Sequence, residues 1–319
     1  MKSGEYYPLK VFLSEKNYFI IPDMQRDYCW PKYKPENLNN SILTEFLTDI
    51  LSLIKKDNPE DENIISLGLI YSYEYPAYFN YLIDGQQRLT TLYLLLGVIN
   101  CYSDDHDLES FLVTNENQPR LKYEIRTTTN HFIAALINNA FLTKDKLSLK
   151  ELKKTNWYRD YYNDDPTIEN MVLAVQEINQ KITNENISQV KSWLNKIGFI
   201  YINFKEEIKG TELNGIKSVR ELGEKMYEIV NTTGDPMELN EHKKAKLLSE
   251  YQKVNEEIEK TEQWEIMQDY FWNIRIKKKH ESADEGFNFF LKSIEEIKKG
   301  KNEILSDFSM VHDYFLSFF

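Results

Sequence analysis

The chain has 319 residues, of which 41% are hydrophobic and 28% are charged, as in a folded globular protein and unlike a disordered or collagen-like one. Its 51 acidic residues outnumber 39 Lys and Arg, and the net charge of −12 argues against a general cationic coat for DNA, though not against a local basic groove. The longest apolar run, residues 89–99, is too short for a membrane span, and the first ten residues hold no apolar signal core. Two cysteines make no disulfide framework. We therefore expect a reduced, cytoplasmic chain with no membrane partner.

The first hundred residues mix short apolar runs with Pro and Gly, which is typical of strands separated by turns. A short strand is predicted over residues 18–21 and ends at Pro22. Apolar residues spaced three and four apart then predict an amphipathic helix over residues 36–56.

A hairpin is the simplest prediction for the next segment. Two strand-like runs, residues 64–73 and 78–83, flank a turn over residues 74–77. Gly85 then turns the chain into a strongly apolar helix, which we expect over residues 86–102.

The pattern becomes helical from about residue 125 onward. An apolar stripe over residues 168–182 has helical spacing, and the run 199–204 alternates like a strand that returns to the sheet. We therefore predict an α+β fold: a small mixed sheet with helices over residues 1–125, followed by a mostly helical extension over residues 126–319.

Several common catalytic motifs are absent from the sequence. It contains no GxxxxGK[ST] phosphate loop, no GxGxxG, no HExxH and no GxSxG. The five histidines are scattered, and none has the setting of a small ββα metal nuclease. We therefore expect no nuclease activity from this chain alone.

The strongest functional signal lies where the predicted hairpin leads into the helix. A helix N-terminus offers unpaired N–H groups and a partial positive charge, both suited to phosphate oxygens. Gly85 allows close approach to the backbone, Arg88 can form two hydrogen bonds to one phosphate, and Asp84 can hold a divalent cation. The candidate residues of this segment are Asp84, Gly85, Gln86, Gln87, Arg88, Thr90 and Thr91.

The same residues also permit an interpretation without a ligand. Asp84 followed three residues later by Gln87 is an Asp variant of a capping box. Arg88 would then be an ordinary surface residue. A cap does not explain why two amides, an arginine and two threonines precede so apolar a helix.

Two further clusters carry polar residues next to turn signals. After the first predicted strand, Gln25 and Arg26 precede two aromatic residues and can lie near a ligand, or Arg26 can pair with a neighbouring aspartate. After residue 230, Asn231 and Lys244 flank a Gly-Asp-Pro turn and can close over an anion, or the turn can simply join two helices.

These three clusters, in this order, resemble the N-terminal domain family of GmrSD-type, modification-dependent restriction enzymes. The family pattern I-P-x-x-Q-R-x-Y-x-W is matched by residues 21–30, D-G-Q-Q-R-L-T-T-L by residues 84–92, and N-T-x-G-x-P by residues 231–236. Residues 121–126 are similar to its Y-x-x-R element. Thr233 stands where the family often has a basic residue, which weakens that side of an anion pocket.

The resemblance implies a front unit similar to ParB and sulfiredoxin. In the ParB relatives, a strand-to-helix turn holds a nucleoside triphosphate. The family is linked to nucleotide binding and hydrolysis, to sensing modified phage DNA, and to an HNH-type nuclease in a second domain or a partner subunit. We therefore expect the nucleotide-dependent sensor half of an antiphage restriction system, which can also form a homo-oligomer.

In this hypothesis Mg²⁺ accompanies the nucleoside triphosphate. The phosphates lie over residues 85–88, Asp84 serves the cation or the attacking water, and Gln87 orients that water. The expected binding residues are Gln25, Arg26, Gly85, Gln86, Arg88, Thr90, Thr91, Asn231 and Lys244. Two alternatives stay open: a modified-DNA recognition module without turnover, which reads DNA with glutamines and arginines of the first two clusters, and a scaffold that docks an HNH nuclease.

Overall fold

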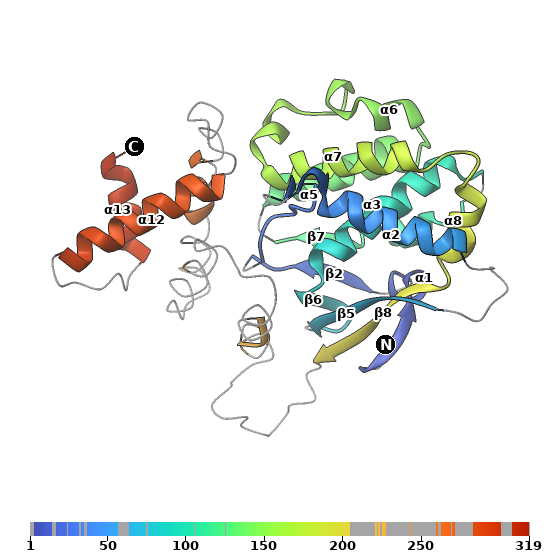
Figure 1. Ribbon diagram of the computed structural model, residues 1–319, viewed down its shortest axis with the longest axis horizontal. Coiled ribbons are helices and arrows are strands. Elements are labelled where there is room, and N and C mark those ends of the chain that lie inside the picture. The colour runs from blue at the N-terminus through green and yellow to red at the C-terminus, as the bar shows by residue number, and fades with distance from the viewer. Residues whose placement is uncertain are drawn as a thin grey trace. The chain divides into compact units, whose positions relative to one another are not determined.

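The computed structural model (Figure 1) divides into two compact units, residues 1–230 and 231–319. The boundary predicted after residue 125 falls inside the first unit. The residues described are 3–14, 17–23, 25–31, 33–34, 37–56, 64–74, 76–104, 106–124, 126–204, 221, 223, 225–227, 243, 260, 263–268, 270–271, 283–300 and 308–318.

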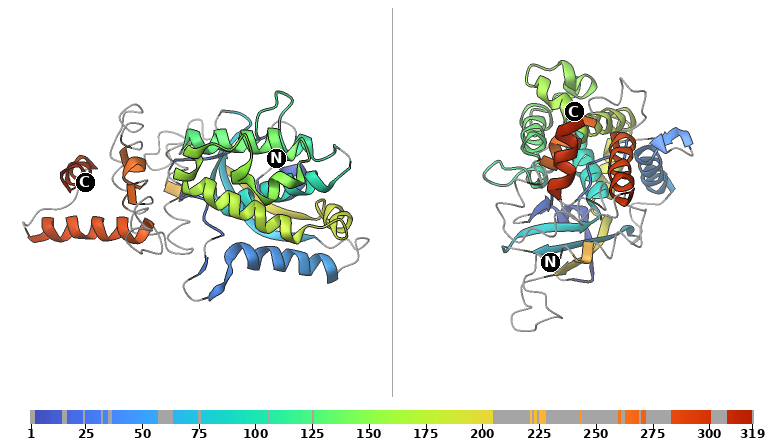
Figure 2. Two further views of the ribbon diagram at one scale, coloured as in Figure 1. Left: turned by 90° about the horizontal axis from the view of Figure 1, so that it is seen from above. Right: turned by 90° about the vertical axis from the view of Figure 1, so that its left-hand side faces the viewer.

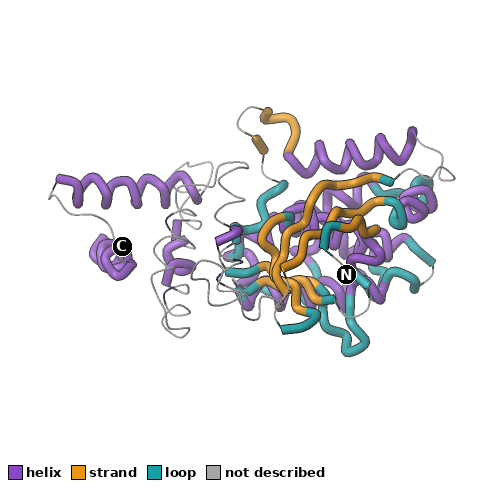
Figure 3. Tube along the Cα trace, turned by 90° about the horizontal axis from the view of Figure 1, so that it is seen from below, coloured by secondary structure: helices purple, strands orange, loops and turns teal. Residues whose placement is uncertain are grey.

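A mixed sheet of six strands, in the order β1-β8-β5-β6-β2-β7, forms one layer of the first unit. Figure 3 shows these strands side by side. The strands are β1 (Glu5–Pro8), β2 (Tyr18–Ile21), β5 (Ile65–Glu74), β6 (Phe79–Asp84), β7 (Leu121–Tyr123) and β8 (Ile197–Phe204). The short strands β3 (Tyr33–Lys34) and β4 (Asn37–Ser41) pair in a second sheet. The predicted α+β class is confirmed.

Strand direction decides which loops lie together. Strand β2 runs parallel to β6 on one side and to β7 on the other, so the carboxyl ends of β6, β2 and β7 meet at one edge of the sheet. β5 and β6 form the predicted antiparallel hairpin. Residues 199–204, expected as a returning strand, lie within β8, which pairs with β5 and β1.

The helices of the first unit that precede β8 in the chain cover one face of this sheet (Figures 1 and 2). They are α1 (Leu9–Phe12), α2 (Ile42–Lys56), α3 (Gln86–Tyr102), α4 (Glu109–Leu112), α5 (Thr127–Leu136), α6 (Lys146–Lys150), α7 (Pro166–Lys181) and α8 (Ile187–Trp193). A π-helix, η1 (Ile137–Phe141), continues α5, and two 3₁₀ turns, η2 (Leu152–Lys154) and η3 (Asp160–Asp164), precede α7. In the described part of the chain, no helix has the length and apolar character needed to cross a bilayer.

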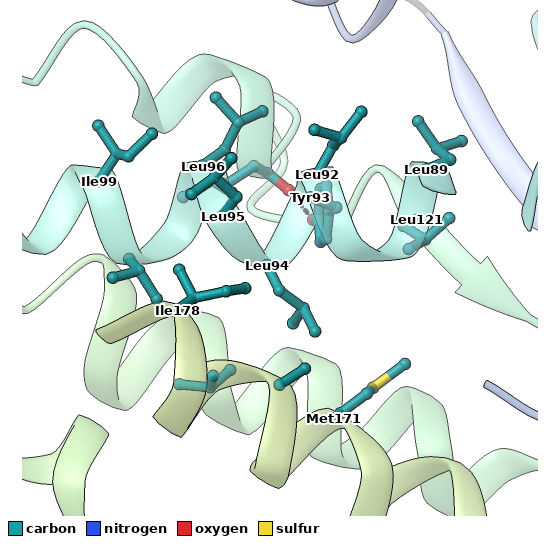
Figure 4. Packing of buried hydrophobic residues seen from close by; sticks show 14 of the residues in the cluster. Leu89, Leu92, Tyr93, Leu94, Leu95, Leu96, Ile99, Leu121, Met171 and Ile178 are labelled. Carbon is teal, nitrogen blue, oxygen red and sulfur yellow. Dashed lines mark hydrogen bonds between the residues drawn. The ribbon is translucent and has the colours of Figure 1, made fainter. Parts of the chain in front are cut away.

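Helix α3 is the centre of the core. Almost all of its side chains are buried, which is expected of a helix that is apolar on every side. Its leucines pack on Met171 and Ile178 of α7, as Figure 4 shows. The apolar stripe predicted over residues 168–182 is therefore the face of α7 that contacts α3.

One helix begins later than the sequence predicts. Residues 37–41 form β4, and α2 starts at Ile42 instead of residue 36. The Oγ of Ser41 accepts a hydrogen bond from the Thr44 N–H at 3.1 Å, so Ser41 caps the first turn of the helix. The spacing of the apolar residues predicts that a helix is present, but it does not predict the residue at which the helix begins.

The second unit has a helical core of its own. Helices α12 (Ala283–Gly300) and α13 (Phe308–Phe318) bury aromatic residues together with Trp264 and Met267. The described part of this unit is helical, in agreement with the predicted helical extension.

Four buried tyrosines make the first unit sensitive to alkali. Burial raises the pKa of the Tyr28, Tyr93, Tyr123 and Tyr201 hydroxyls above the usual value of 10.0. An unfolded chain ionises these groups near that value, so their contribution to folding is complete below pH 10 and is lost as the pH rises.

We therefore expect the free energy of unfolding to fall steeply above about pH 10. Urea unfolding at a series of pH values measures it, with phenolate absorbance followed in parallel. Full ionisation of every tyrosine while the protein stays folded would contradict the burial of these hydroxyls.

Candidate functional site

The carboxyl ends of β6, β2 and β7 bring the sequence motifs together. The end of β6 and the first turn of α3 carry Asp84 to Arg88, the loop after β2 carries Gln25 and Arg26, and Arg126 follows β7. Ligands of sheets with parallel strands commonly bind at this edge, where the strands end. The first two predicted clusters are therefore neighbours in space.

Gly85 shapes the start of α3. It is the N-cap residue, has a left-handed φ of 95°, and provides no side-chain cap. An added Cβ at this position would lie 2.9 Å from Cγ1 of Ile70 in the paired strand. The alternative in which Asp84 caps the helix is therefore wrong, because the left-handed residue comes between Asp84 and the first turn.

Arg88 and Asp84 form a charged pair beside this turn. The Arg88 Nη1 donates to the Leu67 carbonyl at 2.7 Å, and its Nη2 donates to the Asp84 Oδ2 at 3.3 Å. The two side chains are 23% and 42% exposed, respectively. Burial lowers the pKa of the Arg88 guanidinium and the charge of Asp84 opposes that shift, and an arginine stays protonated in either case. The site therefore presents a cation and an accessible carboxylate.

Gln25 is used inside the protein. Its Nε2 donates to the carbonyls of Leu82 and Ile83 at 3.2 and 2.7 Å. Both carbonyls belong to β6, so this side chain joins the loop after β2 to the neighbouring strand. The amide hydrogens of Gln25 are directed at the protein backbone.

The two glutamines of α3 hold the same loop. Gln87 donates to the Asp27 carbonyl at 2.8 Å and accepts from the Cys29 N–H at 2.9 Å. Gln86 donates to the Arg26 carbonyl at 2.9 Å. The Gln86 Oε1 is buried and has no hydrogen-bond partner among the described residues. Arg26 is thus fixed beside the first turn of α3 through its backbone.

The two threonines of the motif bond to buried tyrosines. The Thr90 hydroxyl pairs with Tyr123 and the Thr91 hydroxyl with Tyr28, each at 2.7 Å. All four side chains are buried. These bonds link α3 to β7 and to the loop after β2.

The third cluster, with Asn231, Lys244 and the turn between them, lies outside the described residues. Among the described ranges, no group of three or more His, Cys, Asp or Glu side chains is arranged to hold a metal ion. Within that part of the chain, Asp84 does not belong to a cluster of protein ligands for a metal.

A buried ion pair joins the residue after β7 to the start of α7. The Arg126 Nη1 lies 3.3 Å from the Asp165 Oδ1. The Arg126 side chain is 8% exposed and the Asp165 side chain is 3% exposed. The Asp165 carboxylate also accepts from the hydroxyls of Thr128 and Thr129, at 2.8 and 2.6 Å, and from the Thr167 N–H at 2.9 Å. Asp165 thus caps α7 and neutralises the arginine that follows β7.

Asp27 connects this pair to the loop after β2. Its Oδ1 accepts from the Thr167 hydroxyl at 2.9 Å, and its Oδ2 lies 3.9 Å from Arg126. From the sequence, Arg126 was predicted only as part of the Y-x-x-R element, and Asp165 was not predicted to take part. The dipeptide Asp165-Pro166 is a helix-start signal that would have placed this cap.

Gly68 was also missed. It has a positive φ of 93°, and an added Cβ would lie 2.5 Å from the Arg88 Nη1. An isolated glycine inside a strand pattern often indicates a bulge or a close approach, and that signal was present in the run 64–73.

Comparison with models of known protein families identifies one family. A family model described as the N-terminal domain of the GmrSD restriction endonuclease matches residues 9–248. No curated protein matches the chain. The matched range includes all three sequence clusters and every strand of the six-stranded sheet except β1, which ends at Pro8.

Proposed function

Since the chain belongs to the GmrSD restriction endonuclease N-terminal domain family, we propose that it binds and hydrolyses a nucleoside triphosphate to regulate an antiphage restriction system. The observation that carries this proposal is the start of α3, where an uncapped first turn lies beside Arg88 and Asp84. The HNH-type nuclease would be a second domain or a partner subunit.

The phosphates are assigned to the first turn of α3. Gly85 has no side chain to cover the backbone there, and the helix dipole favours an anion at this end. Arg88 supplies the positive charge. Its two described contacts use two of the five guanidinium N–H groups, so three remain, and two of these can form a forked pair with phosphate oxygens. The buried, unpaired Gln86 Oε1 supports a bound water or ligand hydroxyl next to this turn.

Asp84 is assigned to the cation and the hydrolytic water. Mg²⁺ is commonly held by one or two carboxylates together with phosphate oxygens and waters, so a single exposed carboxylate fits it. When bound, this ion would neutralise the charge that develops on the phosphates. Asp84 would accept a hydrogen bond from the water that attacks the terminal phosphorus, while the bond from that phosphorus to the leaving nucleoside diphosphate breaks.

Several motif residues are assigned a positioning role in place of ligand contact. Gln25, Gln87, Thr90 and Thr91 make their hydrogen bonds within the protein. The side-chain oxygen and nitrogen of Gln87 both form hydrogen bonds with the backbone of the loop after β2. We therefore assign Gln87 the role of holding this loop in place, instead of orienting the water. Arg26 then stays a binding residue, fixed by that loop.

A DNA-reading module without turnover receives less support. That alternative needs the amides of Gln25 and Gln86 to contact bases, yet both donate to backbone carbonyls. The net charge of −12 also disfavours a large phosphate-backbone footprint.

The test is calorimetric titration of the full chain with ATP, GTP, CTP and UTP, with and without Mg²⁺, followed by a phosphate-release assay without DNA. We expect heat of binding with at least one triphosphate, and Mg²⁺-dependent release. Retardation of modified DNA in a gel, without nucleotide binding, would replace this proposal with the DNA-reading module.

A further inference from the structure

We propose that Gly68 is a positioning residue for Arg88: a glycine bulge in β5 leaves room for the guanidinium and presents the carbonyl that orients it. This inference rests on the proposed function, because it concerns the arginine assigned to the phosphates. The Arg88 seat is defined here as the Leu67 carbonyl, Gly68 and Gly85.

The bulge is visible in the strand register. Ser66 pairs with Gly198 and Leu69 pairs with Ile200, so two residues of β5 lie opposite one residue of β8. Gly68 has a left-handed φ of 93°, which a glycine adopts without a steric penalty. As a result the Leu67 carbonyl accepts from the Arg88 Nη1 at 2.7 Å.

The Arg88 guanidinium occupies the space next to the Gly68 Cα. A Cβ added at Gly68 would lie 2.5 Å from Nη1 and 3.8 Å from Cζ of Arg88, and no other described atom comes within 4 Å apart from its chain neighbours. On the other side, a Cβ added at Gly85 would lie 3.6 Å from Nη2. Two glycines from different elements therefore flank one guanidinium.

The seat sets which N–H groups of Arg88 are left for a ligand. One hydrogen of Nη1 goes to Leu67 and one of Nη2 to Asp84. A methyl group at Gly68 would push the guanidinium away from this carbonyl without touching the backbone of α3. The expected result is a misdirected arginine in a folded protein.

The first experiment compares Gly68→Ala with Gly4→Ala by nucleotide titration and thermal unfolding. Gly4 has a similar φ of 85° but has nothing within 4 Å of an added Cβ, so it controls for backbone strain alone. We expect Gly68→Ala to bind nucleotide about 10- to 100-fold more weakly, as for the loss of hydrogen bonds to a charged group, and Gly4→Ala to bind normally. Equal affinities would overturn the inference.

The same substitution in an Arg88→Lys background distinguishes an effect on Arg88 from a general loss of structure. Lysine keeps the positive charge but lacks Nη1, so Gly68→Ala should cost much less affinity in an Arg88→Lys background than in the wild type. An equal loss in both backgrounds would show that Gly68 acts through something other than the guanidinium.

A second measurement needs no nucleotide. Urea unfolding of Gly68→Ala, Arg88→Ala and the double variant forms a cycle, in which the cost of Gly68→Ala should shrink when Arg88 is absent. Strict additivity would overturn the contact itself. If the wild type binds no triphosphate, the proposed function fails, and this cycle alone decides whether Gly68 positions Arg88.

Discussion

Replacing Arg88 with alanine abolishes nucleotide binding while the protein stays folded, if the first turn of α3 holds the phosphates. The variant removes the positive charge of the Asp84–Arg88 pair and leaves an exposed carboxylate facing the incoming anion. Loss of a forked charged contact, with each hydrogen bond contributing about 1.5–3 kcal/mol, predicts an affinity loss of at least about 100-fold. Calorimetric titration measures it directly.

The stability of this variant is a separate expectation. The Leu67 carbonyl loses its donor, so we expect the free energy of unfolding to fall by about 1–3 kcal/mol, with the core around α3 unchanged. Arg159→Ala, an exposed arginine in the same unit, is the matched control and should bind normally. Titration heats that are the same for Arg88→Ala and Arg159→Ala would remove Arg88 from the site.

Replacing Asp165 with alanine has the largest expected effect on stability. It removes the cap of α7 and leaves the buried cation of Arg126 without its closest carboxylate. Breaking a buried ion pair by removing one partner costs about 3–5 kcal/mol. Urea unfolding should show a loss of this size.

Asp164→Ala is the control for Asp165→Ala. Asp164 is the exposed neighbour, and its substitution should change the free energy of unfolding by less than about 0.5 kcal/mol. The double variant Asp165→Ala with Arg126→Met should recover part of the loss, because the uncompensated charge is removed with its partner. Similar unfolding midpoints for the two aspartate variants would show that the ion pair contributes little.

Local sequence patterns predicted the elements that form the site. The hairpin of β5 and β6 and the helix α3 follow from alternation, a turn and a long apolar run, all of which lie within one continuous segment. The edge strand β7 is only three residues long, which is too short for a periodicity argument. β4 was assigned to a helix because the apolar spacing of α2 continues into it.

The state of the motif side chains was not predictable in this way. Asp84 and Gln87 have the spacing of a capping box, and only the packing of Gly85 on Ile70 across the hairpin shows that the helix begins differently. An amide in a sequence can bind a phosphate or a carbonyl equally well. Gln25 and Gln87 bond to the backbone because parallel pairing of β2 and β6 places their loops next to each other, a contact between distant parts of the chain.

The position of β8 also has a consequence for biosynthesis. This strand enters the sheet between β1 and β5, although both are made long before it. Until residues 197–204 have emerged from the ribosome, β1 and β5 of the nascent chain each have an unpaired edge. Unpaired strand edges favour aggregation. Non-local pairing of this kind also raises the contact order and slows folding. Recombinant chains that stop before β8 should accumulate as insoluble material, and the intact chain should gain from chaperones during translation.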